Sequence, residues 1–251
     1  CSNNKNKINE INTLVWGDSH AAVFSYELNK HFKKNNINLA FYDCLPLVNV
    51  FIDNNENNKS KIICENSEND IRDIVKKYKI KNIVLSSYWS QYIYGIDTRQ
   101  KGAGTSNSYL SDSKIQSKNK SDALKVFTSN FKKTIIFLNE NKLNIWVIKE
   151  VPTFKTWVPN EAIRQLKYKQ KVNIKRSISE YKNRTLKIND IFENVNYEYD
   201  INFIDPSSAL CDSEFCYGND EKIPLYSDFN HLNEYGLDKI RKIFDNFYEK
   251  L

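Results

Sequence analysis

The sequence contains no methionine, and nothing in it resembles a secretory signal peptide. We therefore expect the chain to be a fragment or a processed form of a longer protein. Its first residues, Cys1 and Ser2, fit either of two interpretations: a mature lipoprotein N-terminus with a lipidated cysteine, or a domain boundary. Residues 1–11 are expected to form a linker or tail.

Long apolar runs are also missing. No stretch approaches the roughly 18 apolar residues that a membrane-spanning helix needs, and the mean hydropathy is −0.63 with 40% hydrophobic residues. A chain of 251 residues can bury a full core in one domain. We therefore predict a single soluble domain over residues 1–251, with a flexible loop or substrate lid in the polar segment 100–120.

Several functional motifs are absent. There is no P-loop, dinucleotide-binding glycine pattern, EF-hand or internal repeat, so no bound cofactor is expected. No dense Lys/Arg block or nucleic-acid motif accompanies the net charge of +6, so nucleic acid is not an expected partner. The charge could favour anionic glycans or a phospholipid surface. It could equally reflect a general abundance of Asn, Lys and Ile.

The most informative segment that is present is Gly17-Asp18-Ser19. The apolar run before it predicts a buried strand, and the residues from Ala21 onward predict an amphipathic helix. A serine at such a corner has an exposed hydroxyl, and its backbone N–H lies where helix N-terminal donors can stabilise an oxyanion. A tight turn with an N-capping Ser or Asp is the alternative.

A second informative segment lies near the end of the chain, where Asp228 precedes His231 by three positions. One turn can hold both side chains on the same side. A solvated histidine at a helix N-terminus is the alternative. Serine needs a base to act as a nucleophile, and Ser, Asp, His is one of the chain orders that build a catalytic triad. Ser19, Asp228 and His231 are therefore the candidate catalytic residues.

Between these segments, short apolar runs alternate with helical patterns, which predicts a parallel sheet with right-handed crossovers. The fold class expected is α/β: a three-layer α/β/α sandwich whose five-stranded parallel sheet has the order 2-1-3-4-5. The expected strands are Asn12–Trp16, Ile37–Tyr42, Asn82–Ser86, Asn144–Ile148 and Asn202–Ile204. The expected helices are Ala21–Asn35, Asn69–Tyr78, Asp122–Glu140, Ile174–Val195 and Glu234–Tyr248, the last capped by Asn233. Active sites in such sheets lie at the carboxyl ends of the strands, where Ser19 would stand.

These residues resemble the SGNH (GDSL-like) hydrolase superfamily. His20, Trp89-x-x-Tyr92 and the phrase from Leu225 to Leu232 narrow the resemblance to the SGNH domain fused to acyltransferase-3 membrane proteins. The resemblance covers about residues 13–247. Two superfamily features are not evident: the oxyanion-donating glycine, expected around residues 43–48, and the Gly-x-Asn-Asp motif, whose place Ile83 to Trp89 occupies. The Ser19 N–H is therefore the one oxyanion donor that the sequence identifies, and the origin of a second donor stays open.

The resemblance implies an O-acetyltransferase that transfers acetyl to a hydroxyl of a bacterial surface glycan, such as lipopolysaccharide O-antigen or capsule. It implies a transmembrane acyltransferase domain, N-terminal or separate, that supplies acetyl ultimately from acetyl-CoA. The implied location is the periplasmic or extracytoplasmic face, tethered to the inner membrane. A carbohydrate O-acetyl esterase and a non-catalytic glycan-binding module are the alternatives.

Four further residues are candidates for contact with substrate: His20, Trp89, Tyr92 and Asn230. Aromatic faces stack well on sugars, although ordinary core packing also explains aromatic residues. For His20, the alternatives are a role in orienting substrate or transferring protons and a position facing solvent.

The cysteines other than Cys1 fall into two local pairs, and four cysteines allow three connectivities. We predict the disulfides Cys44–Cys64 and Cys211–Cys216, which suit an oxidising compartment such as a periplasm. Buried free thiols and a zinc site are the alternatives. The lack of Cys-x-x-Cys and the presence of only three histidines argue against zinc, so no metal is expected.

Overall fold

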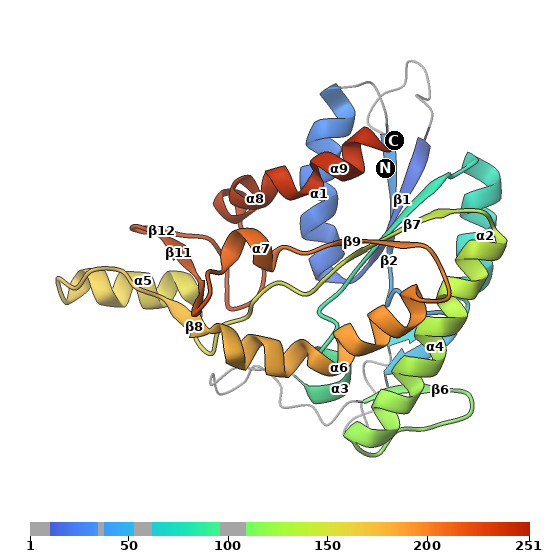
Figure 1. The fold of residues 1–251 in the computed structure, drawn as a ribbon, viewed down its shortest axis with the longest axis horizontal. Helices are drawn as coiled ribbons and strands as arrows, with labels where there is room; N and C mark the ends of the chain where they lie inside the picture. Colours follow the sequence, from blue (N-terminus) through green and yellow to red (C-terminus); the bar gives the residue numbers. More distant parts are fainter. Residues whose placement is uncertain (1–10, 35–37, 53–61, 96–108) are drawn as a thin grey trace.

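The computed structural model describes residues 11–34, 38–52, 62–95 and 109–251. Five parallel strands form the central sheet in the order β2-β1-β5-β7-β9 (Figure 1). Their bounds are β1 Ile11–Gly17, β2 Asn38–Asp43, β5 Asn82–Ser86, β7 Asn144–Ile148 and β9 Ile201–Ile204. Counted within this sheet alone, the order is 2-1-3-4-5, which confirms the predicted topology.

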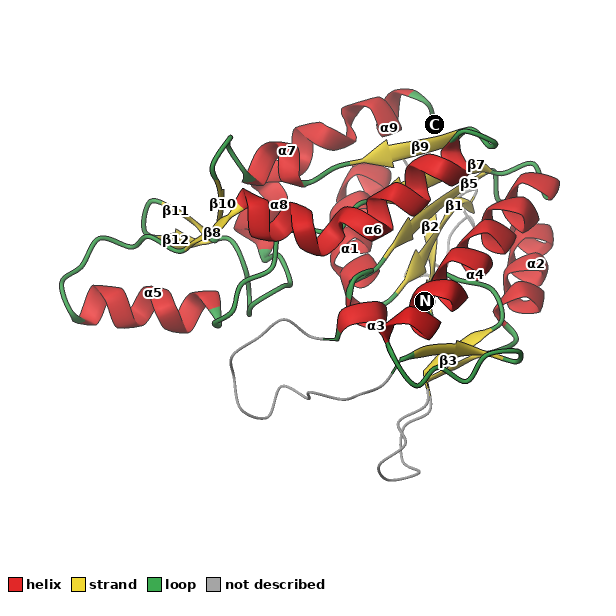
Figure 2. Cartoon of the chain, turned by 60° about the horizontal axis from the view of Figure 1, so that its bottom comes forward, coloured by secondary structure: helices red, strands yellow, loops and turns green. Residues whose placement is uncertain are grey.

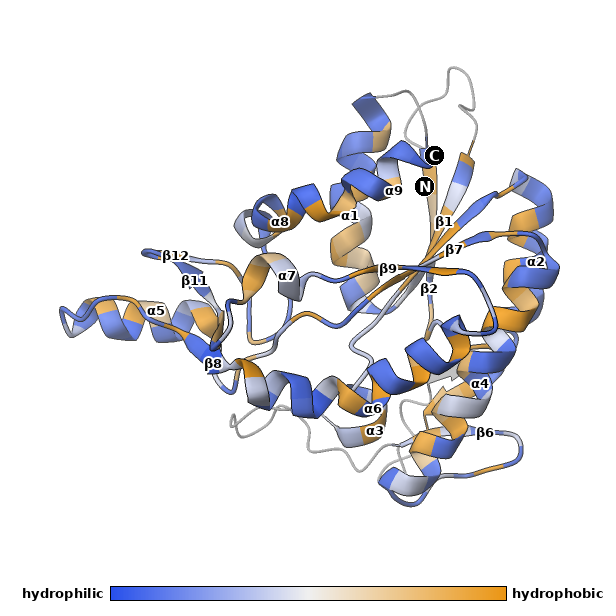
Figure 3. Ribbon diagram, in the orientation of Figure 1, coloured by the Kyte–Doolittle hydropathy of each residue, from blue (hydrophilic) through white to orange (hydrophobic). Residues whose placement is uncertain are grey.

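Helices cover both faces of the sheet (Figures 1 and 2). One layer contains α2 (Ser67–Tyr78), α4 (Lys120–Glu140) and α6 (Ile178–Asn196); the other contains α1 (Ser19–Lys34), α8 (Glu234–Ile240), the 3₁₀ helix η1 (Arg241–Phe244) and α9 (Asp245–Glu249). Successive strand residues point to opposite faces, so Leu14 and Trp16 pack under the first layer and Val15 under the second. Along these helices apolar residues recur among polar ones (Figure 3), and the buried ones belong to the two clusters that pack on the two faces of the sheet. The predicted α/β/α sandwich is confirmed.

Two predicted helices differ from the structure. The segment predicted as one helix from Ile174 begins with the short strand β8 (Lys175–Ser177), and α6 follows it. The last helix is divided into α8, η1 and α9 rather than continuous. Its predicted N-cap is confirmed, because the Asn233 side chain accepts a hydrogen bond from the Gly236 N–H.

A small antiparallel sheet, in the order β4-β3-β6, lies beside the main sheet. Its strands are β3 (Val50–Ile52), β4 (Ile62–Cys64) and β6 (Leu110–Asp112). The prediction of a flexible loop over residues 100–120 is therefore wrong for β6, where Leu110 is fully buried and the segment pairs with β3. The rest of that loop up to residue 108, and residues 1–10 of the predicted tail, lie outside the described residues.

The region after β7 contains short elements that the sequence pattern did not predict. These are α5 (Val158–Lys167), α7 (Ser207–Leu210), β10 (Phe215–Tyr217), β11 (Asn219–Asp220) and β12 (Ile223–Pro224). The short helix α3 (Gln91–Tyr94), which follows β5, was not predicted either. Strand β8 pairs with β10, and β11 pairs with β12. Helix α5 projects from the body of the molecule in both views (Figures 1 and 2).

Both predicted disulfides are present. Cys44–Cys64 links the end of β2 to β4, and Cys211–Cys216 closes the loop before β10. Cys44 directly follows β2 at the carboxyl edge of the sheet, and Cys211 and Cys216 lie between β9 and the turn that contains Asp228. The two disulfides therefore hold loops on the side of the fold where the strands end.

Candidate active site

Ser19 is the first residue of α1 and is exposed. It follows β1 at the carboxyl edge of the sheet, where Gly17 pairs with Asp43 of β2 and Ser86 of β5. A Cβ atom at Gly17 would lie 1.8 Å from the Ser86 carbonyl oxygen. Only glycine therefore allows the two strands to approach this closely beneath the serine, and the predicted exposed corner is confirmed.

The Asp18 carboxylate fixes this corner. Its Oδ1 accepts the His20 N–H at 2.9 Å, and its Oδ2 accepts the Ser87 hydroxyl at 2.6 Å and the Tyr88 N–H at 3.0 Å. The Tyr92 hydroxyl donates to the same Oδ2. Hydrogen bonds to an ionised acceptor are stronger than neutral ones. Asp18 thus joins the start of α1 to the segment after β5 and holds Ser19 in place.

Asp228 and His231 lie in one turn close to Ser19. Asp228 Oδ1 accepts the backbone N–H groups of Asn230 and His231, both at 2.8 Å. Asp228 Oδ2 lies 2.6 Å from His231 Nδ1, and His231 Nε2 lies 2.7 Å from Ser19 Oγ. The three predicted catalytic side chains therefore form one hydrogen-bonded chain from carboxylate to hydroxyl.

The pKa of Asp228 reflects this environment. Burial alone would raise it, but the hydrogen bond with His231 and the two backbone N–H donors outweigh burial and hold the pKa below its ordinary value. The carboxylate is thus ionised at neutral pH. An ionised Asp228 accepts a hydrogen bond from the Nδ1–H of His231, which leaves Nε2 unprotonated toward Ser19.

The backbone around the turn holds it rigidly against the fold. Tyr226 and Leu232 form a β-bridge, and the Ser227 N–H donates to the His231 carbonyl at 2.9 Å. From the β7–α5 segment, the Phe154 and Val158 N–H groups donate to the carbonyls of Phe229 and Asp228, at 2.7 and 2.9 Å. The start of α5 is thereby bonded directly to the turn that carries Asp228 and His231.

His20 lies behind His231 and is only 3% exposed, which rules out the solvent-facing alternative. Its ring contacts two others: the distance between ring centroids is 4.8 Å to His231 and 5.3 Å to Tyr88. Its Nε2 is buried with no hydrogen-bond partner among the described residues. Burial lowers the pKa of His20 to about 4, with Asp18 opposing the shift and His231 adding to it. His20 is therefore a neutral ring against the back of His231; contact with substrate stays a prediction.

Replacing His20 with phenylalanine keeps an aromatic ring in this place but removes the titration. Because the folded-state pKa lies below the unfolded value of 6.5, the unfolded chain binds more protons between these values, and His20 makes stability fall as the pH is lowered. We expect this contribution to amount to about 2 kcal/mol between pH 7 and pH 5. Urea unfolding of both proteins at the two pH values measures it. All other groups titrate in both chains, so two proteins that lose the same stability would contradict the expectation.

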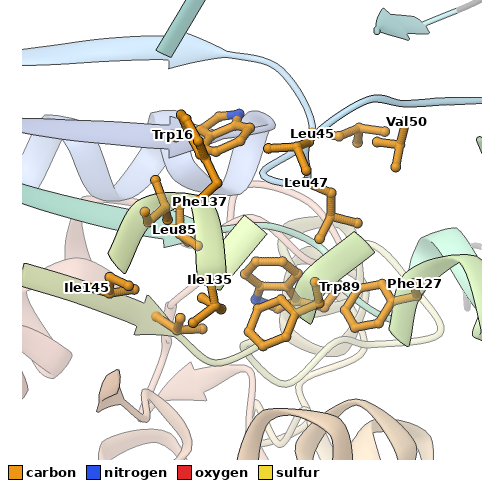
Figure 4. Packing of buried hydrophobic residues seen from close by; sticks show 14 of the residues in the cluster. Trp16, Leu45, Leu47, Val50, Leu85, Trp89, Phe127, Ile135, Phe137 and Ile145 are labelled. Carbon is orange, nitrogen blue, oxygen red and sulfur yellow. The ribbon is translucent and has the colours of Figure 1, made fainter. Parts of the chain in front are cut away.

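Two candidates for contact with sugar are wrong. Trp89 is fully buried, donates its Nε1–H to the Ile148 carbonyl at 2.9 Å, and packs edge-on against Phe127 and other core rings (Figure 4). Tyr92 is 4% exposed and its hydroxyl is bonded to Asp18. The segment after β5 turns these aromatic faces into the core, so neither can stack on a substrate.

Asn230 is brought to the site, although its side chain is 3% exposed. Its backbone N–H supports Asp228, and its side-chain Oδ1 is buried with no partner among the described residues. Its contact with substrate stays a prediction.

The segment 44–48, where the superfamily glycine is not evident, does not offer a free backbone donor. Four of its five residues have an N–H, since residue 46 is proline. The acceptors of these N–H groups are Gly17 O and Tyr42 O for Cys44, Cys64 Sγ for Leu45, Leu45 O for Leu47 and Thr134 Oγ1 for Val48. The expected second oxyanion donor is therefore to be sought outside residues 44–48.

Sequence reasoning missed the supporting residues Asp18, Ser87 and Glu150. The carboxylate of Glu150 accepts hydrogen bonds from the Ser90 N–H and hydroxyl, at 2.6 and 2.8 Å, and burial raises its pKa to about 7. It ties the segment after β5 to the end of β7. Asp18 could have been found, because it belongs to the Gly-Asp-Ser motif, whereas Glu150 belongs to no motif.

No three His, Cys, Asp or Glu side chains gather as a possible metal site in the described part of the chain. Among the helices described, none is long and apolar enough to cross a membrane.

Two comparisons with known proteins found matches. The family model of the SGNH domain fused to AT3 domains matches residues 1–246. A solved structure, the periplasmic domain of a lipopolysaccharide acetyltransferase from Salmonella ser. Paratyphi A, is similar with a TM-score of 0.62 and 17% identity. The match covers 96% of this chain and 85% of that one. At this identity the likeness shows the fold. A comparison with curated protein sequences finds no match. The chain belongs to the family of SGNH domains that are fused to AT3 domains.

Proposed function

We propose that this domain is a serine-dependent O-acetyltransferase that modifies a hydroxyl of a bacterial surface glycan. The observation that carries the proposal is the continuous contact from Ser19 Oγ through His231 to Asp228. A serine that is exposed, held at a helix N-terminus and hydrogen-bonded to an oriented imidazole has the features of an activated nucleophile. The family assignment supports acyl chemistry at this serine.

In the first step, Ser19 Oγ attacks the acetyl carbonyl of the donor while His231 Nε2 takes the hydroxyl proton. Asp228 holds the Nδ1–H and stabilises the charged imidazole. The Ser19 N–H is positioned to donate to the oxyanion of the tetrahedral intermediate. When the intermediate collapses, the donor's leaving group takes the proton from His231, and Ser19 is left acetylated.

In the second step, a sugar hydroxyl attacks the acetyl-serine and His231 takes its proton. The carbonyl re-forms, and Ser19 leaves with the proton from His231. If water enters instead of the sugar, the same residues hydrolyse the ester, so a carbohydrate O-acetyl esterase uses the same geometry. We therefore expect some esterase activity in the isolated domain.

The partner and location follow from the family. The AT3 fusion implies a transmembrane acyltransferase domain and a glycan substrate. We propose that this partner delivers acetyl derived from acetyl-CoA, and that the domain works on the periplasmic face beside the inner membrane. The structural neighbour is itself the periplasmic domain of a lipopolysaccharide acetyltransferase, which supports this location.

An acceptor-dependence experiment tests the proposal against the esterase. The chain is incubated with p-nitrophenyl acetate carrying a labelled acetyl group, with and without purified, de-O-acetylated lipopolysaccharide. Ser19-dependent label on the polysaccharide is the expected result. Hydrolysis that depends on Ser19 but never labels lipopolysaccharide or capsule would favour the esterase. A serine that does not react with a fluorophosphonate probe would favour a non-catalytic glycan-binding module.

A further inference from the structure

Helix α5 exposes apolar side chains that the fold does not use. The helix packs through Val158, Ala162 and Gln165, and the Gln165 side chain accepts the Asn173 N–H at 2.7 Å. The buried side of α5 is thus fully used in contacts with the rest of the fold. We define the α5 surface as the side chains on and around the helix that remain exposed: Trp157, Ile163, Leu166 and Tyr168, with Ile223 of the neighbouring β12.

The exposure of these residues is large. Ile163 and Tyr168 are each 64% exposed, and Leu166 is 45% exposed. Single exposed apolar residues are ordinary, but here five of them lie on α5, directly beside it in sequence or on the strand β12 that contacts it. The helix that carries Ile163 and Leu166 projects from the body of the molecule (Figure 2).

The same segment is strongly cationic. Residues 163–171 contain Arg164, Lys167, Lys169 and Lys171 and no acidic residue. The nearest acid on the helix, Glu161, is paired with Arg164 at 2.6 Å. The three lysines are exposed and have no ion pair within the described residues. Exposed apolar and aromatic side chains interleaved with unpaired lysines fit an anionic, partly apolar surface.

We propose that the α5 surface docks this domain on an anionic phospholipid bilayer. Trp and Tyr favour the membrane–water interface, and interfacial helices place apolar residues among the acyl chains while Lys and Arg meet the headgroups. A helix that projects from the body can reach a bilayer surface, which needs no complementary groove. Each lysine beside an anionic surface contributes roughly a fivefold gain in binding.

Docking through the α5 surface would also set the position of the triad turn relative to the bilayer. The start of α5 is bonded to the triad turn through the Val158 N–H and the Asp228 carbonyl. Docking therefore brings the triad turn close to the lipid surface, where a membrane-bound donor or a lipid-attached glycan would be presented. This consequence rests on the proposed function; lipid binding itself does not.

Trp157 provides a direct measurement. It is 40% exposed, whereas the other three tryptophans, Trp16, Trp89 and Trp146, are at most 2% exposed. We expect bromine-labelled lipids in vesicles of phosphatidylcholine and phosphatidylglycerol to quench the fluorescence of the chain. Vesicles of phosphatidylcholine alone should quench it much less, and the Trp157→Phe variant should lose the signal.

Matched variants test which surface binds. In vesicle co-sedimentation, the double variant Lys167→Gln/Lys169→Gln should bind roughly 30-fold more weakly, and Ile163→Ser about tenfold more weakly. The control Lys76→Gln/Lys77→Gln removes the same charge from exposed positions of α2 and should bind within about twofold of the wild type. Hydrolysis of soluble p-nitrophenyl acetate should be unchanged in all of them, which separates this proposal from that of the triad.

Three results would overturn the proposal. The chain does not sediment with the anionic vesicles, or the α2 control loses as much binding as the α5 variant, or Ile163→Ser binds as well as the wild type. The last result would mean that charge alone attracts the chain to the vesicles and that the apolar side chains of the α5 surface serve a protein partner instead.

Discussion

Replacing Ser19 with alanine is expected to lower kcat for p-nitrophenyl acetate by roughly 10⁶-fold, leaving only residual catalysis from binding and the oxyanion donor. The reason is that the hydroxyl 2.7 Å from His231 Nε2 is the proposed nucleophile, and no other group in the described site is placed to replace it. The free energy of unfolding should change by no more than about 0.5 kcal/mol, because Ser19 is exposed.

The matched control is Ser25→Ala on the same helix; among the described residues the Ser25 hydroxyl bonds only to the Ala22 carbonyl. It should retain wild-type turnover. Burst kinetics of p-nitrophenolate release with the wild type would measure acetyl-serine formation directly. If the Ser19→Ala protein is folded and retains turnover within tenfold of the wild type, the nucleophile has been assigned wrongly.

Asp228→Asn is expected to lower kcat by roughly 10⁴-fold. Asp228 Oδ1 accepts two backbone N–H groups, so an asparagine must place its oxygen there and its NH₂ group toward His231 Nδ1. Nδ1 must then accept a hydrogen bond, which moves the ring proton to Nε2. His231 in this tautomer cannot take the proton of Ser19.

Steady-state turnover of p-nitrophenyl acetate measures this effect, and NMR of the imidazole nitrogens reports the tautomer. Asp73→Asn, at an exposed position of α2, is the control and should leave both unchanged. A Asp228→Asn protein that keeps Nδ1 protonated and loses less than tenfold in turnover would show that Asp228 does not set the tautomer.

The central sheet could be predicted because its strands are short, apolar runs buried on both faces, which leave a clear signal between amphipathic helices. The bounds of Asn82–Ser86 and Asn144–Ile148 agree with the structure to the residue. The strands of two or three residues, such as β6 and β8, are too short to show any periodicity. β6 and β8 form because β3 and β10, which are distant from them in sequence, offer them backbone partners.

Some residues of the candidate site could likewise be predicted from the sequence, and others could not. Ser19, Asp228 and His231 could be found because their chemistry requires particular residue types at particular corners of the fold. Trp89 and Tyr92 were misplaced because a sequence does not reveal whether an aromatic side chain after a strand turns into the core or toward the solvent. Glu150 went unnoticed because its role depends on a partner, Ser90, 60 positions away.

The hydrogen bond between Ser19 and His231 joins residues 212 positions apart. During synthesis, the serine therefore emerges well before its proposed base. Until the segment that carries His231 has been made and has folded, no base activates the serine, so under the proposed mechanism the domain cannot react with an acetyl donor. Under that mechanism, turnover would also report that the turn of Asp228 and His231 has docked beside β1.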